Sequence, residues 1–289
     1  MAYAVIDYKS SKKRWGKINT TYDVGEVNIS LPHFKEKQTA RISKKVLHLL
    51  EIEKIKNVVI SRDLSLNKLF CELLTQHNKN IITGRKMFKA LILRILKDVA
   101  AQMKMELAKL KVVLLIDFYS VENADLVRTI AKEVKTLTVV TTDKDKFDKL
   151  IKDLFEGYGI TVKVVEKNIT RFDESNVLIN VDFSSYDMNR IVMPAYSLII
   201  CGFANHFEIP KNFQGIVIKD IDIIDVENEN EMIDDLALCE AKIYSYLRRL
   251  KENDRVFERE NFKINGYFGT NGKILLHEFR NLGKNLLDK

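Results

Sequence analysis

Three aspartates follow predicted strands and are the first candidates for chemistry. Asp117 comes directly after the apolar run 111–116, and Asp182 and Asp187 come after the run 177–181. The carboxyl ends of parallel strands meet at one edge of a sheet, where such folds bind ligands, so we expect these side chains to converge. Clustered carboxylates can hold Mg²⁺, but capping of helix ends is the commoner role of aspartate in such places. The sequence therefore predicts no metal site here.

Histidines and cysteines do not form a metal-binding or catalytic pattern either. The five histidines show no HxH or HExxH spacing, and neither a GxSxG elbow nor a GxxxxGK[ST] loop occurs. Cys71, Cys201 and Cys239 each lie in an apolar stretch without a CxxC partner. This pattern is typical of buried, reduced thiols in a cytoplasmic protein.

The turn that follows the run 111–116 lacks the features of a dinucleotide site. Such a site needs glycine for a tight turn and for close approach of the backbone to the pyrophosphate. Residues 117–125 (DFYSVENAD) contain no glycine, two aromatic side chains and three carboxylates, which repel a pyrophosphate. The sequence therefore predicts no bound cofactor at this turn.

The end of the next predicted strand, residues 137–141, keeps NADP open as an alternative cofactor. Thr141, Thr142 and Lys144 supply the hydroxyl and cationic side chains that can hold a ribose phosphate. The competing interpretation is that Asp143 begins a helix as its N-cap, with the neighbouring lysines in water.

Charge is unevenly distributed along the chain. Residues 1–110 carry 22 Lys and Arg against 10 Asp and Glu, a net charge of +12, whereas residues 111–289 carry 25 against 30, a net charge of −5. Residues 9–17 concentrate five cations and the single tryptophan. Lys12, Lys13, Arg14 and Trp15 are therefore candidates for contact with an anionic partner such as a nucleic acid. The alternative is a charged tip that keeps a sheet edge soluble.

The elements that must position these residues define an α/β protein. We expect residues 2–8, 17–22 and 26–31 to form a small antiparallel three-strand element, followed by α-β-α-β up to residue 85. Residues 86–108 carry the strongest helical pattern and are expected to link two domains; a homodimer through this helix stays open.

The middle of the chain alternates between apolar runs and helical patterns, which predicts βαβ units, three layers and a mainly parallel sheet. After the acidic stretch from residue 220, we expect a helix over 229–252 and a hairpin around residues 269–272. The predicted domains are 1–85, 86–225 and 226–289. No apolar run reaches the ~18 residues of a membrane span, and the N-terminus has no leader pattern, so we expect a cytoplasmic protein without membrane contact.

Two segments of the middle region resemble the shikimate dehydrogenase and glutamyl-tRNA reductase group. Residues 137–150 (LTVVTTDKDKFDKL) are similar to its second strand and helix, and residues 175–188 (SNVLINVDFSSYDM) are similar to its Asp-Ile-Ile-Asn-Ala-Thr segment, with Asn180 at the asparagine. The resemblance covers residues 86–210, and implies a Rossmann-like domain with Asn180 at the cofactor site. The glycine-free turn departs from the family and puts the cofactor in doubt.

A further resemblance lies near the N-terminus. Residues 28–35 (NISLPHFK) are similar to the shikimate dehydrogenase motif Asn-Val-Thr-x-Pro-His-Lys, with Phe34 as an extra residue. The resemblance implies that Lys35 acts as an acid/base, but the aspartate that works with it in that family is missing from the expected segment, residues 80–84.

The residues favour a binding or regulatory protein on a Rossmann-like scaffold with a degenerate dinucleotide site. The first alternative is an NAD(P)-dependent oxidoreductase similar to shikimate dehydrogenase. The second is a nucleic-acid-associated protein that uses its basic N-terminal half. The sequence leaves open whether the protein is an enzyme, because such scaffolds carry many functions.

Overall fold

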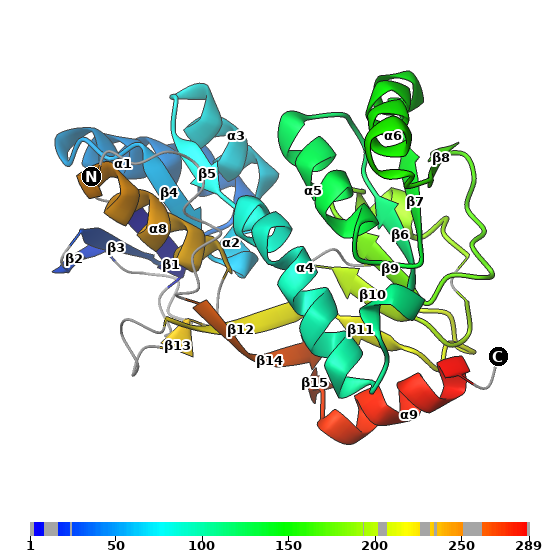
Figure 1. Cartoon of the computed structure of the whole chain (residues 1–289). Helices are drawn as coiled ribbons and strands as arrows, with labels where there is room; N and C mark the ends of the chain where they lie inside the picture. Colours follow the sequence, from blue (N-terminus) through cyan, green and yellow to red (C-terminus); the bar gives the residue numbers. More distant parts are fainter. Residues whose placement is uncertain are drawn as a thin grey trace. The chain divides into compact units, whose positions relative to one another are not determined.

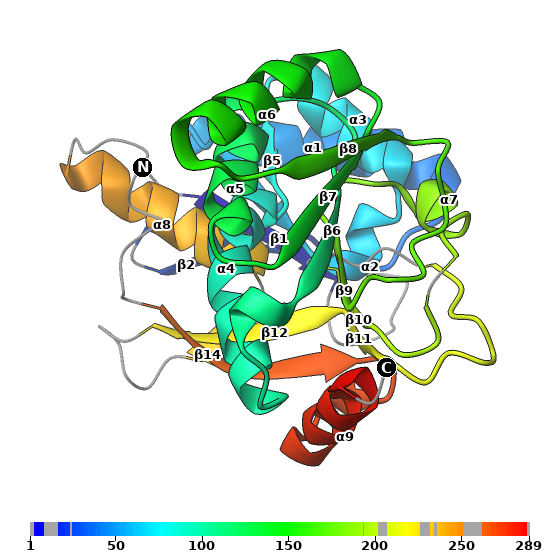
Figure 2. The same ribbon diagram turned by 45° about the vertical axis from the view of Figure 1, so that its right-hand side comes forward.

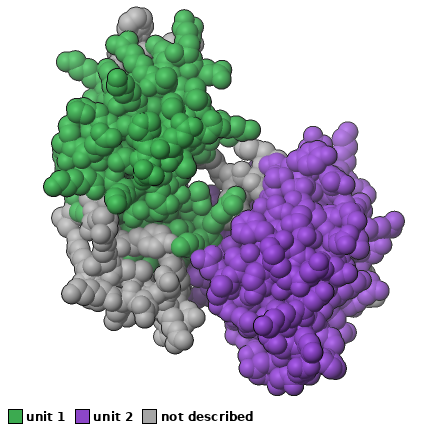
Figure 3. Space-filling model, turned by 90° about the horizontal axis from the view of Figure 1, so that it is seen from above, with its two compact units in different colours: residues 1–87, 225–262 green, residues 88–224, 263–289 purple. Residues whose placement is uncertain are grey.

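The computed structural model describes residues 3–8, 17–23, 25–192, 194–201, 207–225, 232–233, 236–250 and 262–287. The chain divides into two compact units, coloured separately in Figure 3. Unit 1 contains residues 1–87 and 225–262, and unit 2 contains residues 88–224 and 263–289. Each unit is therefore built from two separate stretches of chain. The domains predicted from the sequence, 1–85, 86–225 and 226–289, concern which stretches fold independently. They stay a prediction.

Unit 1 is a five-stranded mixed sheet in the order β2-β3-β1-β4-β5, with helices on both faces (Figure 1). Its elements are β1 (Tyr3–Tyr8), β2 (Asn19–Asp23), β3 (Glu26–Leu31), η1 (Glu36–Gln38), α1 (Thr39–Ile52), β4 (Asn57–Ile60), α2 (Arg62–Ser65), α3 (Lys68–Gln76), β5 (Asn80–Ile82), β13 (Met232–Ile233) and α8 (Leu236–Leu250).

The predicted antiparallel arrangement of the first three strands is wrong. β2 and β3 are antiparallel, but β1 pairs in parallel with both β3 and β4. β1 is central because both of its faces are apolar. Ala4 and Ile6 pack in the core formed with α1, α2 and α3, whereas Tyr3 packs with Ala237 of α8.

Unit 2 contains a six-stranded, all-parallel sheet in the order β11-β10-β9-β6-β7-β8 (Figure 2). Its elements are α4 (Arg85–Gln102, whose first residues belong to unit 1), η2 (Leu107–Lys109), β6 (Lys111–Leu115), α5 (Val121–Ala131), β7 (Thr136–Thr141), α6 (Lys144–Tyr158), β8 (Val162–Glu166), β9 (Val177–Asn180), α7 (Ser185–Met188), β10 (Leu198–Cys201), β11 (Ile216–Ile218), β12 (Asp220–Asp225), β14 (Phe262–Gly269), β15 (Gly272–Lys273) and α9 (Leu276–Leu287). The predicted α/β class and parallel, Rossmann-like sheet are confirmed.

The central strands of this sheet are apolar on both faces, as their uninterrupted apolar sequence predicts. Val113 and Leu115 of β6 pack with Met188 of α7 on one face. α6 ends at Tyr158, and its C-cap Gly159 has a left-handed backbone with φ +67°, a conformation that glycine adopts without strain.

Several predicted elements near the C-terminus need correction. The acidic stretch 220–225 is strand β12, whose Ile221 and Ile223 share one face and are buried, as is Asp222 between them. Residues 232–233 form strand β13 instead of the start of a helix. The predicted turn at 269–272 joins β14 to β15, but the chain then enters α9, which buries Phe279, Leu282 and Leu286 at helical spacing. The predicted helix 86–108 ends earlier, at Gln102.

Within the described residues, every helix is too short or too polar to cross a membrane.

Candidate functional site

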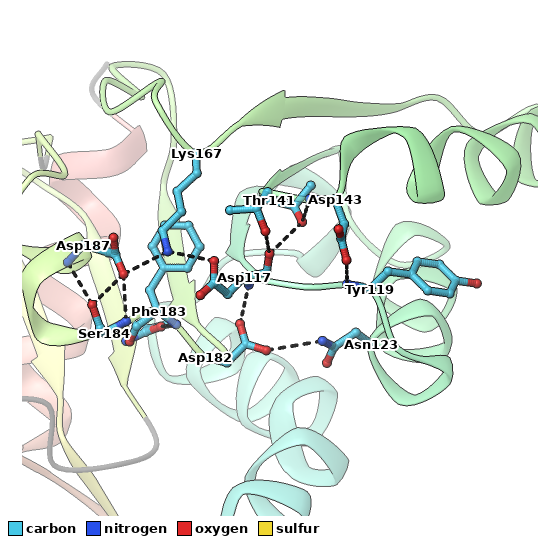
Figure 4. Close-up of polar contacts among 12 residues, drawn as sticks. Asp117, Tyr119, Asn123, Thr141, Asp143, Lys167, Asp182, Phe183, Ser184 and Asp187 are labelled. Carbon is cyan, nitrogen blue, oxygen red and sulfur yellow. Dashed lines mark hydrogen bonds and ion pairs between the residues drawn. The ribbon is translucent and has the colours of Figure 1, made fainter.

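The three predicted aspartates converge at the carboxyl edge of the unit 2 sheet, and a lysine joins two of them (Figure 4). Asp117 follows β6, Asp182 follows β9 and Asp187 lies in α7. Lys167, directly after β8, places its Nζ 2.7 Å from Oδ1 of Asp117 and 2.9 Å from Oδ2 of Asp187. These strands are parallel in the order β9-β6-β7-β8, so their carboxyl ends lie at one edge of the sheet. The long Lys167 side chain reaches along this edge to Asp117 and Asp187.

Lys167 is largely buried in this position, and its ammonium lies 4.7 Å from the centre of the Phe183 ring. Burial opposes the charged form, but the bonds to Asp117 and Asp187 outweigh it and raise the pKa of Lys167. The lysine is therefore a fixed cation between two carboxylates and is unsuited to act as a base at neutral pH.

Asp182 holds the start of the β6–α5 turn. Its Oδ1 accepts the backbone N–H of Asp117, and its Oδ2 accepts a hydrogen bond from Nδ2 of Asn123 at 3.3 Å. Burial raises the pKa of Asp182 above its ordinary value, although these two bonds act in the opposite direction. Asn123 is fully buried, and its Oδ1 has no hydrogen-bond partner among the described residues.

Asp187 caps its own short helix. Ser184 donates its hydroxyl to Oδ2 of Asp187 at 2.5 Å, and Ser184 Oγ accepts the N–H of Asp187 at 3.2 Å. Burial opposes ionisation of Asp187, but the Ser184 bond and the Lys167 ion pair outweigh it and lower its pKa. The predicted capping role of the aspartates is confirmed at this residue.

The β6–α5 turn uses its backbone donors on the protein's own side chains. The N–H of Tyr119 donates to Oδ2 of Asp143 at 2.9 Å, and the N–H of Asn123 donates to Oγ of Ser120, the N-cap of α5. The Tyr119 ring packs edge-on against Phe147 of α6, with ring centres 5.1 Å apart. The turn is therefore locked by contacts to both neighbouring helices.

The predicted N-cap role of Asp143 is only half right. Asp143 occupies the N-cap position of α6, but its carboxylate makes no capping bond to that helix. It accepts instead from Tyr119 and from Nζ of Lys146 at 3.0 Å, and these bonds lower its pKa. The carboxylate of Asp143 accepts the backbone N–H of Tyr119 in the β6–α5 turn instead of an N–H of α6.

A cavity of about 400 Å³ opens between the ends of β7 and β8 and the start of α6. Its lining residues are Thr141, Thr142, Asp143, Lys144, Asp145, Lys146, Glu166, Lys167 and Asn168. Three of the four predicted cofactor-binding residues, Thr141, Thr142 and Lys144, lie together here. The Thr141 and Thr142 hydroxyls both donate to the carbonyl oxygen of Asp117, so they also fasten β7 to the turn.

Asn180, the fourth of these residues, does not line the cavity. It is fully buried in β9, where its amide accepts the N–H of Phe183 at 2.8 Å and donates to the carbonyl of Phe183 at 3.2 Å. Its place in the structure is that of a turn-forming residue that directs the chain after β9.

Lys35 belongs to unit 1. It precedes η1, is exposed, and its backbone N–H donates to Oε1 of Gln38 at 3.0 Å. Beside it, the His33 ring stacks on Tyr8 with ring centres 4.4 Å apart. The other N-terminal candidates, Lys12, Lys13, Arg14 and Trp15, lie outside the described residues.

Sequence reasoning missed Lys167 and Asn123. Lys167 lies one residue beyond β8, so the rule that placed the aspartates at strand ends could have found it. Asn123 gave no signal, because its role depends on burial against Asp182. Among the described residues, no group of three or more His, Cys, Asp or Glu side chains is placed to hold a metal ion.

No protein-family model matches the sequence, and no curated protein matches it either. Solved structures show a distant resemblance. L-tryptophan dehydrogenase from Nostoc punctiforme is 11% identical with a TM-score of 0.39, covering 99% of this chain and 80% of its own. Quinate dehydrogenase from Corynebacterium glutamicum in complex with NAD is 10% identical with a TM-score of 0.31, covering 99% of both chains.

A chorismate mutase/shikimate 5-dehydrogenase fusion protein from Clostridium acetobutylicum is 11% identical with a TM-score of 0.23. The resemblance to shikimate dehydrogenase expected from the sequence is confirmed as a distant structural resemblance, which extends to quinate and amino-acid dehydrogenases. At these values it concerns the Rossmann-like fold and says nothing of activity.

Proposed function

We propose that unit 2 is a ligand-binding domain with a degenerate dinucleotide site and without nicotinamide redox chemistry. One observation carries this proposal: the β6–α5 turn has no glycine, and the N–H groups of Asp117, Tyr119 and Asn123 donate to side chains of the protein itself. A bound pyrophosphate needs donors of this kind at the start of the first helix.

Electrostatics support the same conclusion. Two of the groups that hold the turn are the carboxylates of Asp143 and Asp182, and Glu122 lies in the first turn of α5. A pyrophosphate at this position would face like charges at short range, and displacing them would leave carboxylates without their donors. The carboxylates that accept the backbone N–H groups of the turn therefore also repel the pyrophosphate of a dinucleotide.

The cavity beside the turn suits a small polar ligand. Lys144, Lys146 and Lys167 are balanced by Asp143, Asp145 and Glu166, and Lys146 and Lys167 already pair with carboxylates. Charged groups of both signs favour a ligand that both donates and accepts hydrogen bonds.

Native mass spectrometry of the purified protein, followed by thermal-shift titration, tests the proposal. We expect no co-purified nucleotide and no rise in Tm with NAD, NADP, their reduced forms or ATP, since a ligand that binds the folded state must raise Tm with its concentration. A bound dinucleotide, or a concentration-dependent rise, would overturn the proposal.

An NADP-dependent oxidoreductase is the alternative, and its support is that Thr141, Thr142 and Lys144 line one cavity at the end of β7. Under this alternative, NADP raises Tm more than NAD does, and Lys144→Ala removes the difference. Exposed Lys149, further along α6, provides the matched control Lys149→Ala. Lys35→Ala would then abolish activity and leave the far-UV circular dichroism unchanged. A nucleic-acid partner for residues 12–15 stays a prediction.

A further inference from the structure

Strand β2 is one of the two edge strands of the unit 1 sheet. In the order β2-β3-β1-β4-β5 it is a terminal strand, and no described strand pairs with its outer side. Its five residues, NTTYD, contain no proline or lysine, and its register with β3 is continuous, without a bulge. Proline, lysine and a bulge are usual devices that prevent a sheet edge from pairing, and β2 has none of them. The other edge strand, β5, has only three residues.

Exposed apolar side chains lie on strand β2 and at the end of helix α1. Tyr22 pairs with the buried Val27 of β3 and so points toward the face covered by α1, yet it remains 65% exposed. Its hydroxyl donates to Glu53 at the C-terminal end of α1, and the preceding residue, Ile52, is 61% exposed. Tyr22 therefore offers exposed aromatic surface on the edge strand itself, where the side chain of a paired strand can pack against it.

From this edge we infer that unit 1 pairs with a second copy of the chain through an antiparallel β2–β2 ladder. An antiparallel pair of identical strands has a two-fold axis, which makes the contact self-complementary and closed at two copies. With the axis at Thr21, the middle residue of β2, Asn19 lies opposite Asp23 of the second copy and Thr20 opposite Tyr22.

Charge favours this partner and this direction. Lys17 precedes the strand and Asp23 ends it, so the strand is basic at one end and acidic at the other. Antiparallel self-pairing places Lys17 diagonally across from Asp23 of the second copy, within reach of a long side chain, whereas parallel pairing would set like charges side by side. The cross-strand pair of Thr20 and Tyr22 joins a β-branched to an aromatic residue, a favourable combination.

Two lysine substitutions on the same face of β2 test the inference. Thr21→Lys puts two cations opposite each other on the two-fold axis, and Asn19→Lys puts a cation opposite Asp23 of the second copy. We expect the wild-type chain to show a concentration-dependent monomer–dimer equilibrium in sedimentation velocity. Thr21→Lys should shift it at least tenfold toward monomer, and Asn19→Lys should shift it toward dimer. Both side chains are exposed, so both variants should fold.

Disulfide trapping gives a second, independent measurement. In a Cys71→Ser background, Thr21→Cys should form a disulfide-linked dimer under mild oxidation, because residue 21 faces itself across the axis. Asp23→Cys is the matched control: its two copies are four residues apart along the ladder, about 13 Å, which is too far for a disulfide. The remaining cysteines, Cys201 and Cys239, are buried.

Dimers that respond oppositely to the two lysines, together with selective trapping at residue 21, are the expected result. A chain that stays monomeric at every concentration and forms no more disulfide at residue 21 than at residue 23 would overturn the inference. So would a dimer that both lysine variants leave unchanged, because such a dimer uses another surface.

Discussion

Lys167 is the residue whose removal should disturb the carboxyl edge of unit 2 most. Lys167→Met would leave the carboxylates of Asp117 and Asp187 facing each other without a cation between them. We expect a loss of about 2 kcal/mol in the free energy of unfolding, less than the 3–5 kcal/mol of a fully buried pair because Asp117 is 34% exposed. Urea unfolding followed by circular dichroism measures the loss.

The matched control is Lys163→Met in β8, the strand that precedes Lys167, where the side chain is exposed and the change should be close to zero. In the double variant Lys167→Met, Asp187→Asn, the loss should be smaller than the sum of the single losses, because the second change removes one of the unpaired charges. Strict additivity would mean that the two side chains do not interact.

Asp187 should also give the protein a characteristic response to acid. Its folded pKa is lowered, so its contribution to stability is fully present above the ordinary aspartate pKa of 3.8 and is lost as pH falls through the folded value. The unfolding free energy should therefore fall with acidification below pH 3.8, and Asp187→Asn should flatten that fall.

Exposed Asp148 on α6 provides the control variant, Asp148→Asn, which should keep the wild-type slope. Asp182 acts with the opposite sign, since its raised folded pKa means that its contribution is present at low pH and lost as pH rises through the folded value. Equal slopes for wild type and Asp187→Asn would show that the Lys167 bridge is not formed in solution.

Residue positions at this edge were predictable only where they depend on strand ends. Asp117, Asp182 and Asp187 could be expected to converge, since each follows a strand. Lys167 follows β8 and could have been added by the same rule. Its pairing with Asp117 and Asp187, and the bond from Tyr119 to Asp143, depend on the order of strands in the sheet, which a single sequence does not contain. The sequence shows that the β6–α5 turn has no glycine. The structure adds which side chains accept the backbone N–H groups of that turn.

At the scale of elements, α9 depends on a close approach that only glycine permits. A Cβ built at Gly283 would lie 2.2 Å from the carbonyl oxygen of Met103, just after α4. Gly283→Ala should therefore push α9 away and lower the unfolding free energy by about 1–3 kcal/mol. Urea unfolding and the near-UV signal of Tyr267, which packs on Phe279, report the change.

Gly157→Ala tests the same substitution where there is space. Gly157 lies in α6, and a Cβ there meets nothing within 4 Å, so alanine should stabilise by up to about 1 kcal/mol through its helix propensity. If Gly283→Ala were equally harmless, the packing of α9 against the end of α4 would be wrong.

Elements with one strong period were predicted well, and elements with a mixed pattern were not. The apolar strands of unit 2 and the helix that ends at Tyr158 show their pattern clearly. Strand β12 was hidden by its three aspartates, although Ile221 and Ile223 alternate as a strand requires. The direction of β1 relative to β3 was not predictable from hairpin signals, because the β2–β3 hairpin satisfies them whether or not β1 lies beside it.

At the scale of the whole molecule, unit 1 should depend on a segment far along the chain. Ala237 and Ala241 of α8 pack against Tyr3, Val59 and Ile82 on one face of the sheet, and Glu240 accepts the N–H groups of Lys86 and Met87 at the start of α4. Ala241→Glu would force a carboxylate into this buried face and disrupt the packing of α8, while all residues of unit 2 stay in place. Hydrogen exchange of β1 and β4 should then accelerate strongly, while β6 and β9 of unit 2 should change little.

Unchanged protection in β1 and β4 would show that α8 adds little to unit 1. Glu240→Gln tests the charge of this residue apart from the packing of α8. The glutamine still accepts a hydrogen bond, so only the attraction between the carboxylate and the N-terminus of α4 is removed. The free energy of unfolding should therefore fall by only about 1 kcal/mol.

The two-part construction of unit 1 also has a consequence during synthesis. The first 87 residues leave the ribosome well before α8, which has to wait until residues 88–235 have been translated. At bacterial to eukaryotic elongation rates of about 5–20 residues per second this delay is roughly 7–30 s. During that interval the face that α8 will cover is bare, so the nascent chain is a natural client for chaperones that shield apolar surface.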